Sequence, residues 1–546
     1  MPTFSEEEKK LLDQYVTTTE GDIFAIKNLE GIVGAIYARY SRAKTGLRET
    51  LLKEFVEAGQ IDPIHAGELI ERVLVAYGDD SVGELEGAHV AFENISILAT
   101  KEIEDRRIGG SPIEKSTRYV FFDEKDENGK YKYIRDSAIM ASAFARAYEE
   151  TLDFVFDTYA SLIDPMQKFY HQLFPLEKAE YDVLGTGIKQ KFADLVDEKD
   201  KKAFQTTYKI DLKTKACDSL RCLLPLATKT NVGMFGNGRY YQMLISHLLS
   251  TPYAEVRSIG EQTFTELSKV IPQYVKRAKA KMYNMEIEKN MWRLTQELLG
   301  HFEPQSTDPV ALFPQKDLGS EEFLIANMLY AYSELPLLQI YNLVKGLKKE
   351  TREKIKATYI GERETRRDRP GRALESGYLY TFDLCADFGT YKDLMRHRAN
   401  TQMRQVFSPR HGFIIPQDVA DAGFTSQIME CHKRVAALYE QIYSHLGPVA
   451  SYVVLHGHRV RWVMGMNDRA AMHMLELRST KQGHPQYRKL SQQMHHAIES
   501  VQPWRAHIMN FVDHNSYDSA RGDSEARQRV KEKMMDEKFG TTLTNE

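Results

Sequence analysis

The feature that most constrains the fold of this chain is an internal repeat. Residues 36–41 resemble residues 329–334, and a second matched pair, residues 247–257 and 478–488, lies further along each half. Both members of that second pair carry basic residues 10 positions apart. Ordered similarities at matched spacing indicate two copies of one structural unit.

The two copies differ in length. The first has 151 residues between Arg106 and Arg257, whereas the second has 92 between Arg396 and Arg488. The first copy therefore carries about 59 extra residues. The predicted organisation is a first repeat over residues 1–300 with an insertion near 121–215, a polar linker over 301–320, a second repeat over 321–515 and a polar tail over 516–546.

Hydrophobic periodicity predicts a mainly helical chain. Apolar residues recur three and four positions apart in most of the sequence, which is typical of helices packed on a core. Shorter segments at 118–122 and 378–382 predict strands. This mixture indicates an α+β protein. The helical segments are residues 28–59, 137–173, 254–300, 321–358 and 424–457.

Composition excludes several classes of protein. Lys and Arg number 73 against 77 Asp and Glu, so the chain is not a polycation built to coat nucleic acid. The first ten residues lack the pattern of a secretory signal, and no apolar run of about 18 residues predicts a membrane span. The four cysteines form no C-x-x-C pair. We expect a reduced, cytoplasmic protein.

Basic residues are concentrated near the start of the second copy. Arginine is permanently charged and presents planar paired donors that match phosphate oxygens. The cluster therefore fits either a phosphate-containing ligand or a solvated loop bridged to surface carboxylates. Its members are Arg396, His397, Arg398, Arg404, Arg410 and His411.

The first copy offers a different set of polar residues over 111–118. Ser116 and Arg118 alternate in a segment expected to be a strand, so they are expected to project to one side and to hold one phosphate. Glu114 could bond a base or orient an arginine. The competing interpretation is a turn before a strand, with Ser111 and Pro112 as the turn signal.

These segments resemble two halves of the signature of flavin-dependent thymidylate synthases, R-H-R-x-x-S-x-N-E-x-S-x-R. Residues 396–401 keep the front of the pattern and residues 106–118 keep its back. The resemblance covers roughly residues 30–290 and 320–515. For each repeat it implies a small, mainly antiparallel sheet with packed helices. Further matches are residues 467–478 with the family's N-x-R…H-F-x-x-L-R stretch, residues 221–225 with its A-R-x-x-L-P segment, and Arg257 and Arg488 with its E-I-R arginine.

Neither copy keeps the whole pattern. In the second copy the family's glutamate falls on Arg404 and its last arginine on Ser408, changes that should abolish dUMP binding there. In the first copy the R-H-R positions end on Ile108, and His247 replaces the arginine matched by Arg478. We therefore predict one composite site that draws on both repeats. The resemblance assigns Ser111, Glu114, Ser116 and Arg118 to substrate binding, Arg396, His397, Arg398 and Asn467 to flavin binding, and Arg257, Arg478 and Arg488 to catalysis.

The resemblance implies a methyltransferase that converts dUMP to dTMP by reductive methylation. FAD would be the cofactor, with NADPH and methylenetetrahydrofolate as cosubstrates. Two double-length chains would form a homodimer that reproduces the family's four-unit assembly. The alternatives are an enzyme acting on another uracil nucleotide, and a flavin- or nucleotide-binding protein without catalysis, which Arg404, Val406 and Ser408 favour.

Other motifs carry less information. His456 with His458, and His495 with His496, suggest metal ligands, but the sequence places no third ligand, so no metal is predicted. The basic segment 363–372 contains interleaved acidic residues, which favours a solvated loop over an RNA site. Nucleic acid is therefore not an expected partner.

Overall fold

The computed structural model describes residues 4–29, 32–57, 60–61, 80–517 and 521–539. The chain forms two compact units. Unit 1 contains residues 1–95, 99–115 and 230–285, and unit 2 contains residues 96–98, 116–229 and 286–546. Unit 2 thus combines the middle of the first repeat with the second repeat.

Unit 1 is built on a small sheet in which β7 (Lys229–Asn237) lies between β3 (Gly87–Ser96) and β4 (Gly110–Glu114). Strands β4 and β7 are antiparallel. The N-terminal part holds α1 (Glu6–Leu12), α2 (Val33–Tyr40), α3 (Leu47–Glu54) and the pair β1 (Val56–Glu57) and β2 (Gln60–Ile61). The other elements are η2 (Asp80–Glu84), α5 (Ile97–Glu104), α9 (Gly238–Leu248), α10 (Ala254–Leu267) and α11 (Pro272–Val275).

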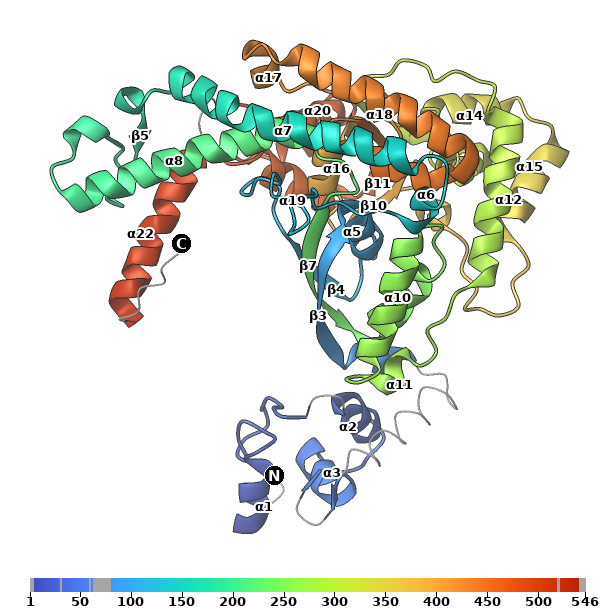
Figure 1. Cartoon of the computed structure of the whole chain (residues 1–546). Helices are drawn as coiled ribbons and strands as arrows, with labels where there is room; N and C mark the ends of the chain where they lie inside the picture. The colour runs from blue at the N-terminus through green and yellow to red at the C-terminus, as the bar shows by residue number, and fades with distance from the viewer. Residues whose placement is uncertain (1–3, 30–31, 58–59, 62–79, 518–520, 540–546) are drawn as a thin grey trace. The chain divides into compact units, whose positions relative to one another are not determined.

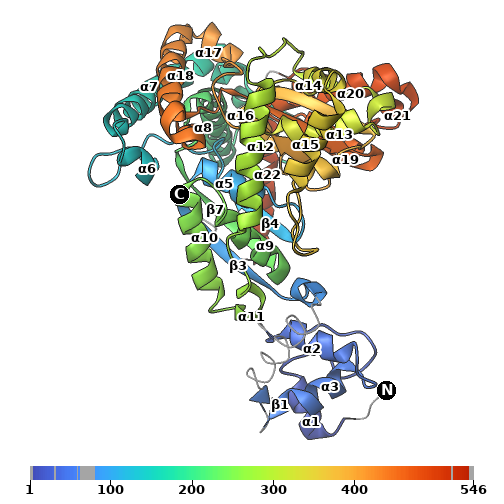
Figure 2. The ribbon, with the colours of Figure 1, turned by 90° about the vertical axis from the view of Figure 1, so that its right-hand side faces the viewer.

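Unit 2 contains a second antiparallel sheet, in the order β10 (Thr401–Arg404), β11 (Arg459–Met466), β9 (Tyr380–Asp387) and β8 (Val310–Leu312). Every residue of β9 is buried, which is expected of a strand covered on both faces. The helices of the second repeat are α13 (Glu321–Tyr330), α14 (Leu337–Lys345), α15 (Lys349–Ile360), η7 (Arg372–Glu375), α16 (Phe388–Leu394), α17 (Gln417–Asp421), α18 (Thr425–Leu446), η8 (Gly447–Val453), α19 (Asp468–Ser479), α20 (Pro485–Val501) and α21 (Pro503–His507). Figure 2 shows α19 and α20 close together.

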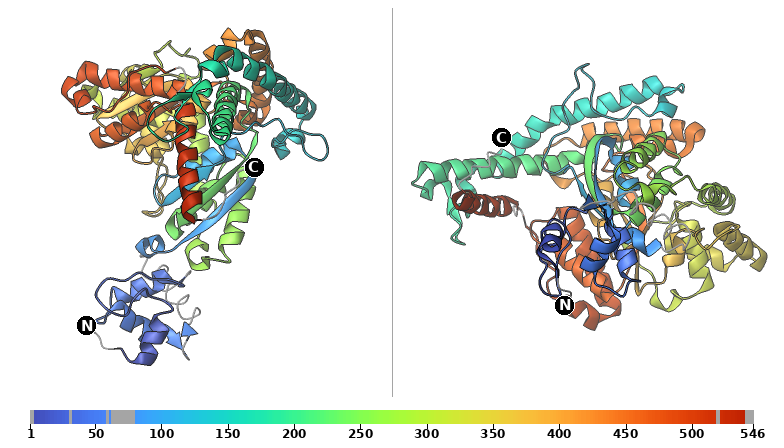
Figure 3. Two further views of the ribbon diagram at one scale, coloured as in Figure 1. Left: turned by 90° about the vertical axis from the view of Figure 1, so that its left-hand side faces the viewer. Right: turned by 90° about the horizontal axis from the view of Figure 1, so that it is seen from below.

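Unit 2 also holds the long helices of the first repeat. Helix α7 (Ala145–Leu173) packs against both α8 (Glu198–Leu220) and α18 (Figure 1). Helix α22 (Arg521–Phe539) packs on α8 (Figure 3). The remaining elements are α6 (Ser137–Met140), η3 (Leu176–Lys178), β5 (Glu180–Tyr181), β6 (Gln190–Lys191), η4 (Phe192–Asp194), η5 (Arg221–Leu223), α12 (Met282–Leu299) and η6 (Gln315–Asp317).

The order of elements confirms the duplicated α+β architecture. The first repeat runs β3, α5, β4, later β7, α9 and α10, and the second runs β9, α16, β10, later β11, α19 and α20. In each sheet the last of these strands lies between the first two. The first repeat has α7 and α8 between β4 and β7, whereas the second has α18 as its long helix there.

Equivalent segments of the two repeats pair with each other inside unit 2. The Leu226 amide donates to the Val454 carbonyl at 2.8 Å, and the His456 amide donates to the Leu224 carbonyl at 2.9 Å. These peptide groups belong to buried residues, so each repeat satisfies backbone groups of the other.

Some local expectations differ from the structure. Residues 118–122 form no strand: β4 ends at Glu114, residues 117–119 form a turn, and the Ser116 hydroxyl accepts a hydrogen bond from the Arg118 amide at 3.2 Å. The segment expected as a linker, 301–320, contributes β8 to a sheet. The polar tail contains α22, while residues 540–546 lie outside the described part. The repeat boundaries themselves stay a prediction.

In the described part of the chain, no helix is long and apolar enough to cross a membrane. The four cysteines are buried and unbridged.

Candidate functional site

Arg118 lies at the centre of a group of polar contacts in unit 2. Its Nε and Nη2 donate to the two carboxylate oxygens of Asp218 at 2.8 and 2.9 Å, a bidentate pair. Its Nη1 lies 3.4 Å from the hydroxyl of Tyr487 at the start of α20. Burial opposes the charged form, but Asp218 raises the pKa of Arg118 overall. Arg118 is therefore a fixed, nearly buried cation.

Arg221 supplies a second buried cation nearby. It lies at the start of η5 and is 3% exposed. Its Nη1 is 3.4 Å from Asp393, and its Nη2 has no hydrogen-bond partner among the described residues. Burial would raise the pKa of Asp393, but Arg221, Arg118 and Arg396 together lower it. A buried guanidinium nitrogen without a partner is a place where an anionic ligand gains most.

The N-terminal end of α20 lies near Arg221 and contributes His484 and Gln486. His484 is buried, and burial together with Arg221 lowers its pKa to about 3, so the imidazole is neutral. With its amide oriented to donate, Gln486 places its nitrogen 3.0 and 3.2 Å from the carboxylate oxygens of Asp387. Burial raises the pKa of Asp387. A small cavity is lined by Asp218, Arg221, Cys222, Asp387, Ile414, Pro416, His456, Gly457 and Gln486.

Residues of the second repeat's basic segment form the other side of the site. His397 is 8% exposed, whereas Arg396 and Arg398 on either side of it are exposed. Arg478 on α19 donates from its Nε to His397 Nε2 at 2.7 Å. Burial and then Arg478 lower the pKa of His397 to about 3. His397 is therefore a neutral acceptor between two exposed guanidinium groups.

Tyr487 lies near one predicted site residue from each repeat. The Arg118 guanidinium lies 5.8 Å from the centre of its ring, and the Arg478 guanidinium lies 5.5 Å from it. Both distances are within the range of cation–π attraction. Arg118 comes from the first repeat and Arg478 from the second, so one chain brings parts of both motif copies together. The composite site drawn from both repeats, within one chain or between two, stays a prediction.

Two other predicted residues of unit 2 have structural partners. Arg488 is 6% exposed and donates to the carbonyls of Ser479 at 2.9 Å and Asn515 at 3.0 Å. Asn467 is exposed and caps α19 by accepting from the Ala470 amide at 3.0 Å. Both side chains thus have local roles beside any ligand contact.

The remaining predicted residues, apart from Ser116, belong to unit 1. Ser111 is exposed on β4. The buried Glu114 carboxylate lies 3.1 Å from Lys101 Nζ and 3.2 Å from the Thr100 hydroxyl. Arg257 donates to the Thr251 carbonyl at 2.9 Å. A buried carboxylate paired with a buried ammonium is held in place and would need to exchange partners to bind a base.

The first repeat replaces the Arg478–His397 contact with a different pair. His247, the counterpart of Arg478, has its Nε2 3.0 Å from a carboxylate oxygen of Glu102. Burial and then Arg106 lower the pKa of His247. The first repeat has thus lost the arginine at this position and kept a polar contact.

Sequence reasoning missed several residues of the unit 2 site. Asp218 lies near the end of α8, inside the helices that distinguish the first repeat, and no motif includes it. Tyr487 stands next to Arg488, so the matched spacing could have drawn attention to it. Asp393 and His484 have no signal of their own, because the fold alone brings them to Arg221.

Comparison with known proteins identifies the family. The family model described as thymidylate synthase complementing protein matches residues 30–273 and 327–504. The chain belongs to this family. It is also 37% identical to a UPF0159 protein of Chlamydia pneumoniae, over 96% of this chain and 98% of that protein. A UPF0159 protein of Thermoplasma acidophilum is 29% identical over 91% of this chain and 98% of its own length.

The family match covers both repeats, in agreement with the duplicated order of elements. It makes the protein thymidylate synthase-like. The names of the two relatives state no reaction.

Proposed function

We propose that this chain catalyses the reductive methylation of dUMP to dTMP at a site composed from both repeats. The observation that supports this most is the position of Tyr487, whose ring lies near Arg118 of the first repeat and near Arg478, which donates to His397 of the second repeat's motif half. Neither repeat alone carries a complete signature, and unit 2 contains Ser116 and Arg118 of the first repeat together with residues 396–398 of the second.

The nucleotide phosphate would bind beside Arg118 and Arg221. Arg118 is paired with Asp218, and Arg221 has Asp393 at 3.4 Å on one nitrogen and no partner on the other among the described residues. A phosphate dianion there would share these cations with the two carboxylates. We propose that Asp218 and Asp393 hold the guanidinium groups in position for the ligand.

The flavin would bind against the segment 396–398. Exposed Arg396 and Arg398 offer charge for a pyrophosphate, and His397 between them is held neutral by burial and by Arg478. This donor set fits a dinucleotide such as FAD. FAD, once bound, would supply the hydride that converts the one-carbon unit of methylenetetrahydrofolate to methyl, after reduction by NADPH.

The chain's own residues would position the base and stabilise charge. Arg478 keeps its orientation through His397 and its contact with the Tyr487 ring, so its guanidinium is preorganised. We propose that Arg478 stabilises negative charge that develops on the uracil during transfer. Arg488 would act as a positioning residue, because its donors already hold two backbone carbonyls. Ser116 and Asn467 of unit 2 keep their expected ligand roles as part of this proposal, while the expected roles of Ser111, Glu114 and Arg257 in unit 1 stay predictions.

A spectroscopic experiment tests the proposal directly. The full chain is loaded with FAD and reduced anaerobically with NADPH, with and without dUMP, while absorbance near ~450 nm is followed. We expect flavin uptake and faster bleaching with dUMP, both reduced by Arg478→Gln. The matched control is Arg146→Gln, an exposed arginine of α7 paired only with Glu150 among the described residues. Failure to take up flavin would contradict the proposal.

A second function is favoured by specific contacts. Two donor groups of Arg118 are bound to Asp218, and Glu114 is paired with buried Lys101. Each side chain would have to exchange a protein partner to contact a substrate. This favours a flavin- or nucleotide-binding protein without catalysis. Flavin uptake with no effect of dUMP on bleaching, and none of UMP, would favour this function. An effect of UMP alone would indicate a different uracil nucleotide as substrate.

The assembly is part of the proposal. The family forms four-unit assemblies, so a double-length chain would form a homodimer. Light scattering on the purified protein measures this directly, and a strictly monomeric protein would contradict it.

A further inference from the structure

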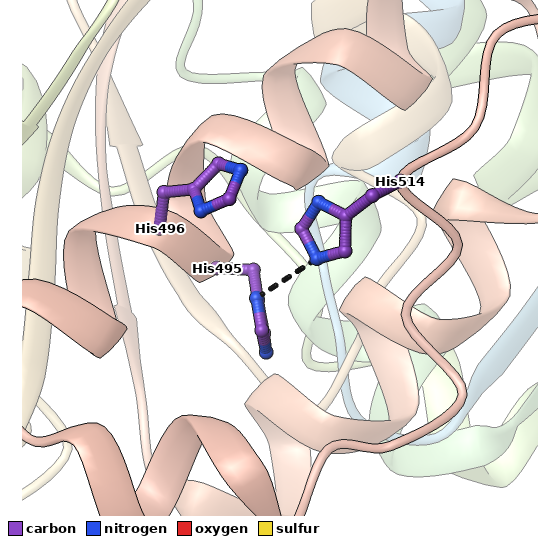
Figure 4. Close-up of side chains that lie close together, drawn as sticks. All are labelled: His495, His496 and His514. Carbon is purple, nitrogen blue, oxygen red and sulfur yellow. Dashed lines mark hydrogen bonds between the residues drawn. The ribbon is translucent and has the colours of Figure 1, made fainter.

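Three histidines gather in unit 2 outside the site described above. His495 and His496 are neighbours on α20, and His514 lies on the segment that follows α21 (Figure 4). One ligand atom from each lies within 4.8 Å of those of the other two. The sequence pointed to the first two, and the third becomes visible only when the chain folds back past α21.

The spacing of the ring nitrogens suits a small metal ion. His514 Nε2 and His495 Nδ1 are 3.2 Å apart. Two nitrogens that bind one tetrahedral zinc ion at ~2.0–2.1 Å stand ~3.3 Å from each other. The two imidazoles therefore already have nearly the separation that shared coordination requires.

The other nitrogen of each α20 histidine already has a partner. His495 Nε2 lies 3.0 Å from the Ala506 carbonyl, which can only accept, so this nitrogen carries the hydrogen and Nδ1 presents its lone pair to His514. His496 Nδ1 lies 3.1 Å from the Glu499 carboxylate, which leaves Nε2 for a ligand. A carbonyl or carboxylate behind the ring is the usual support of a metal-binding histidine.

We propose that His495, His496 and His514 form a binding site for a divalent transition metal of the zinc class. Three imidazole ligands without a carboxylate favour zinc, nickel or copper over magnesium or calcium, which prefer oxygen. His495 is buried, whereas His496 and His514 are exposed, so the fourth coordination position faces solvent. The site is one that an exchangeable ligand or water can complete.

The site would fix a segment that supports Arg488. The neighbours of His514 are Asp513, whose carbonyl accepts from Gln492 on α20, and Asn515, whose carbonyl accepts from Arg488. A metal that bridges His514 to α20 would restrain both contacts. The metal's role is therefore structural, and it acts on Arg488 through the backbone of residues 513–515.

Metal titration of the untagged full chain tests the proposal. The protein is first dialysed against a chelator, and Co²⁺ or Zn²⁺ is then added while calorimetry and the cobalt visible spectrum are recorded. We expect one equivalent to bind. His496→Gln and His514→Gln should each weaken binding more than ~10-fold, and Glu499→Gln should weaken it by ~10-fold or less.

The control variant is His301→Gln, an exposed histidine outside the cluster. Circular dichroism establishes that each variant is folded, and the choice of two exposed ligands avoids disturbing buried His495. Binding weaker than ~1 mM, or affinity that neither His496→Gln nor His514→Gln lowers, would overturn the proposal.

Discussion

At the scale of single residues, Arg118 depends on one carboxylate. Asp218 accepts hydrogen bonds from Nε and Nη2 of Arg118, and the two side chains are 14% and 15% exposed. Asp218→Asn keeps the shape but removes the charge, so Arg118 would remain nearly buried with only neutral acceptors from residue 218 and Tyr487. We expect the free energy of unfolding to fall by about 1–3 kcal/mol in urea denaturation.

The matched control for Asp218→Asn is Glu150→Gln on α7. This glutamate forms an exposed pair with Arg146 four residues away. Solvent screens such exposed pairs, so we expect Glu150→Gln to have little effect on stability. Equal effects of the two substitutions would show that the Arg118–Asp218 pair has no special structural role.

His397 provides a pH-dependent prediction. Its pKa is about 3 in the folded protein and near the ordinary value of 6.5 in the unfolded chain. The unfolded state therefore takes up the proton first as the pH falls. The contribution of neutral His397 to the unfolding free energy is fully present above pH ~6.5 and is lost progressively as the pH falls toward 3. We expect His397→Gln to reduce the slope of unfolding free energy against pH by up to about 1.4 kcal/mol per pH unit.

Chemical denaturation at intervals between pH 6.5 and 4.5 measures that slope for both proteins. Near neutral pH we expect His397→Gln to be less stable because it loses the Arg478 contact, and this difference should shrink as the pH falls. The slope is the informative quantity, since lost packing shifts the curve without tilting it. Parallel curves would mean that His397 titrates normally in the folded protein.

At the scale of elements, the start of α16 packs closely on η5. A Cβ atom added at Gly389 would lie 2.8 Å from Arg221 Nη2 and 2.9 Å from Asp387 Oδ1. Gly389→Ala should therefore displace Arg221, lower stability by about 1–3 kcal/mol and weaken dUMP binding. Gly319→Ala is the control, because no heavy atom of the described residues beyond its chain neighbours lies within 4 Å of its added Cβ. Equal dUMP affinity in both variants would contradict a ligand role for Arg221.

Elements also show what the sequence could and could not predict. Helical periodicity and matched anchors were sufficient for the two repeats, because both depend on local spacing. The strand predicted at 118–122 was wrong. A turn forms there, and the Arg118 amide donates to the Ser116 hydroxyl. Asp218 and His514 could not be assigned, because each reaches its partners only through long-range packing of α8 or of the segment after α21.

At the scale of the whole chain, the two sequence repeats are not two independent folding units. Residues 116–229 of the first repeat belong to unit 2, where segment 222–227 bonds to segment 452–457. A fragment of residues 301–546 would lose α7, α8 and these partners, leaving apolar surface and backbone groups exposed.

We therefore expect fragment 301–546 alone to lack a cooperative thermal transition and fixed near-ultraviolet circular dichroism. Co-expression with fragment 1–300 should restore both, because it supplies residues 116–229, and the two fragments should then purify together. The intact chain is the reference for the transition. A monomeric 301–546 fragment that unfolds cooperatively would contradict this dependence, and it would mean that the composite site forms by docking of two prefolded repeats.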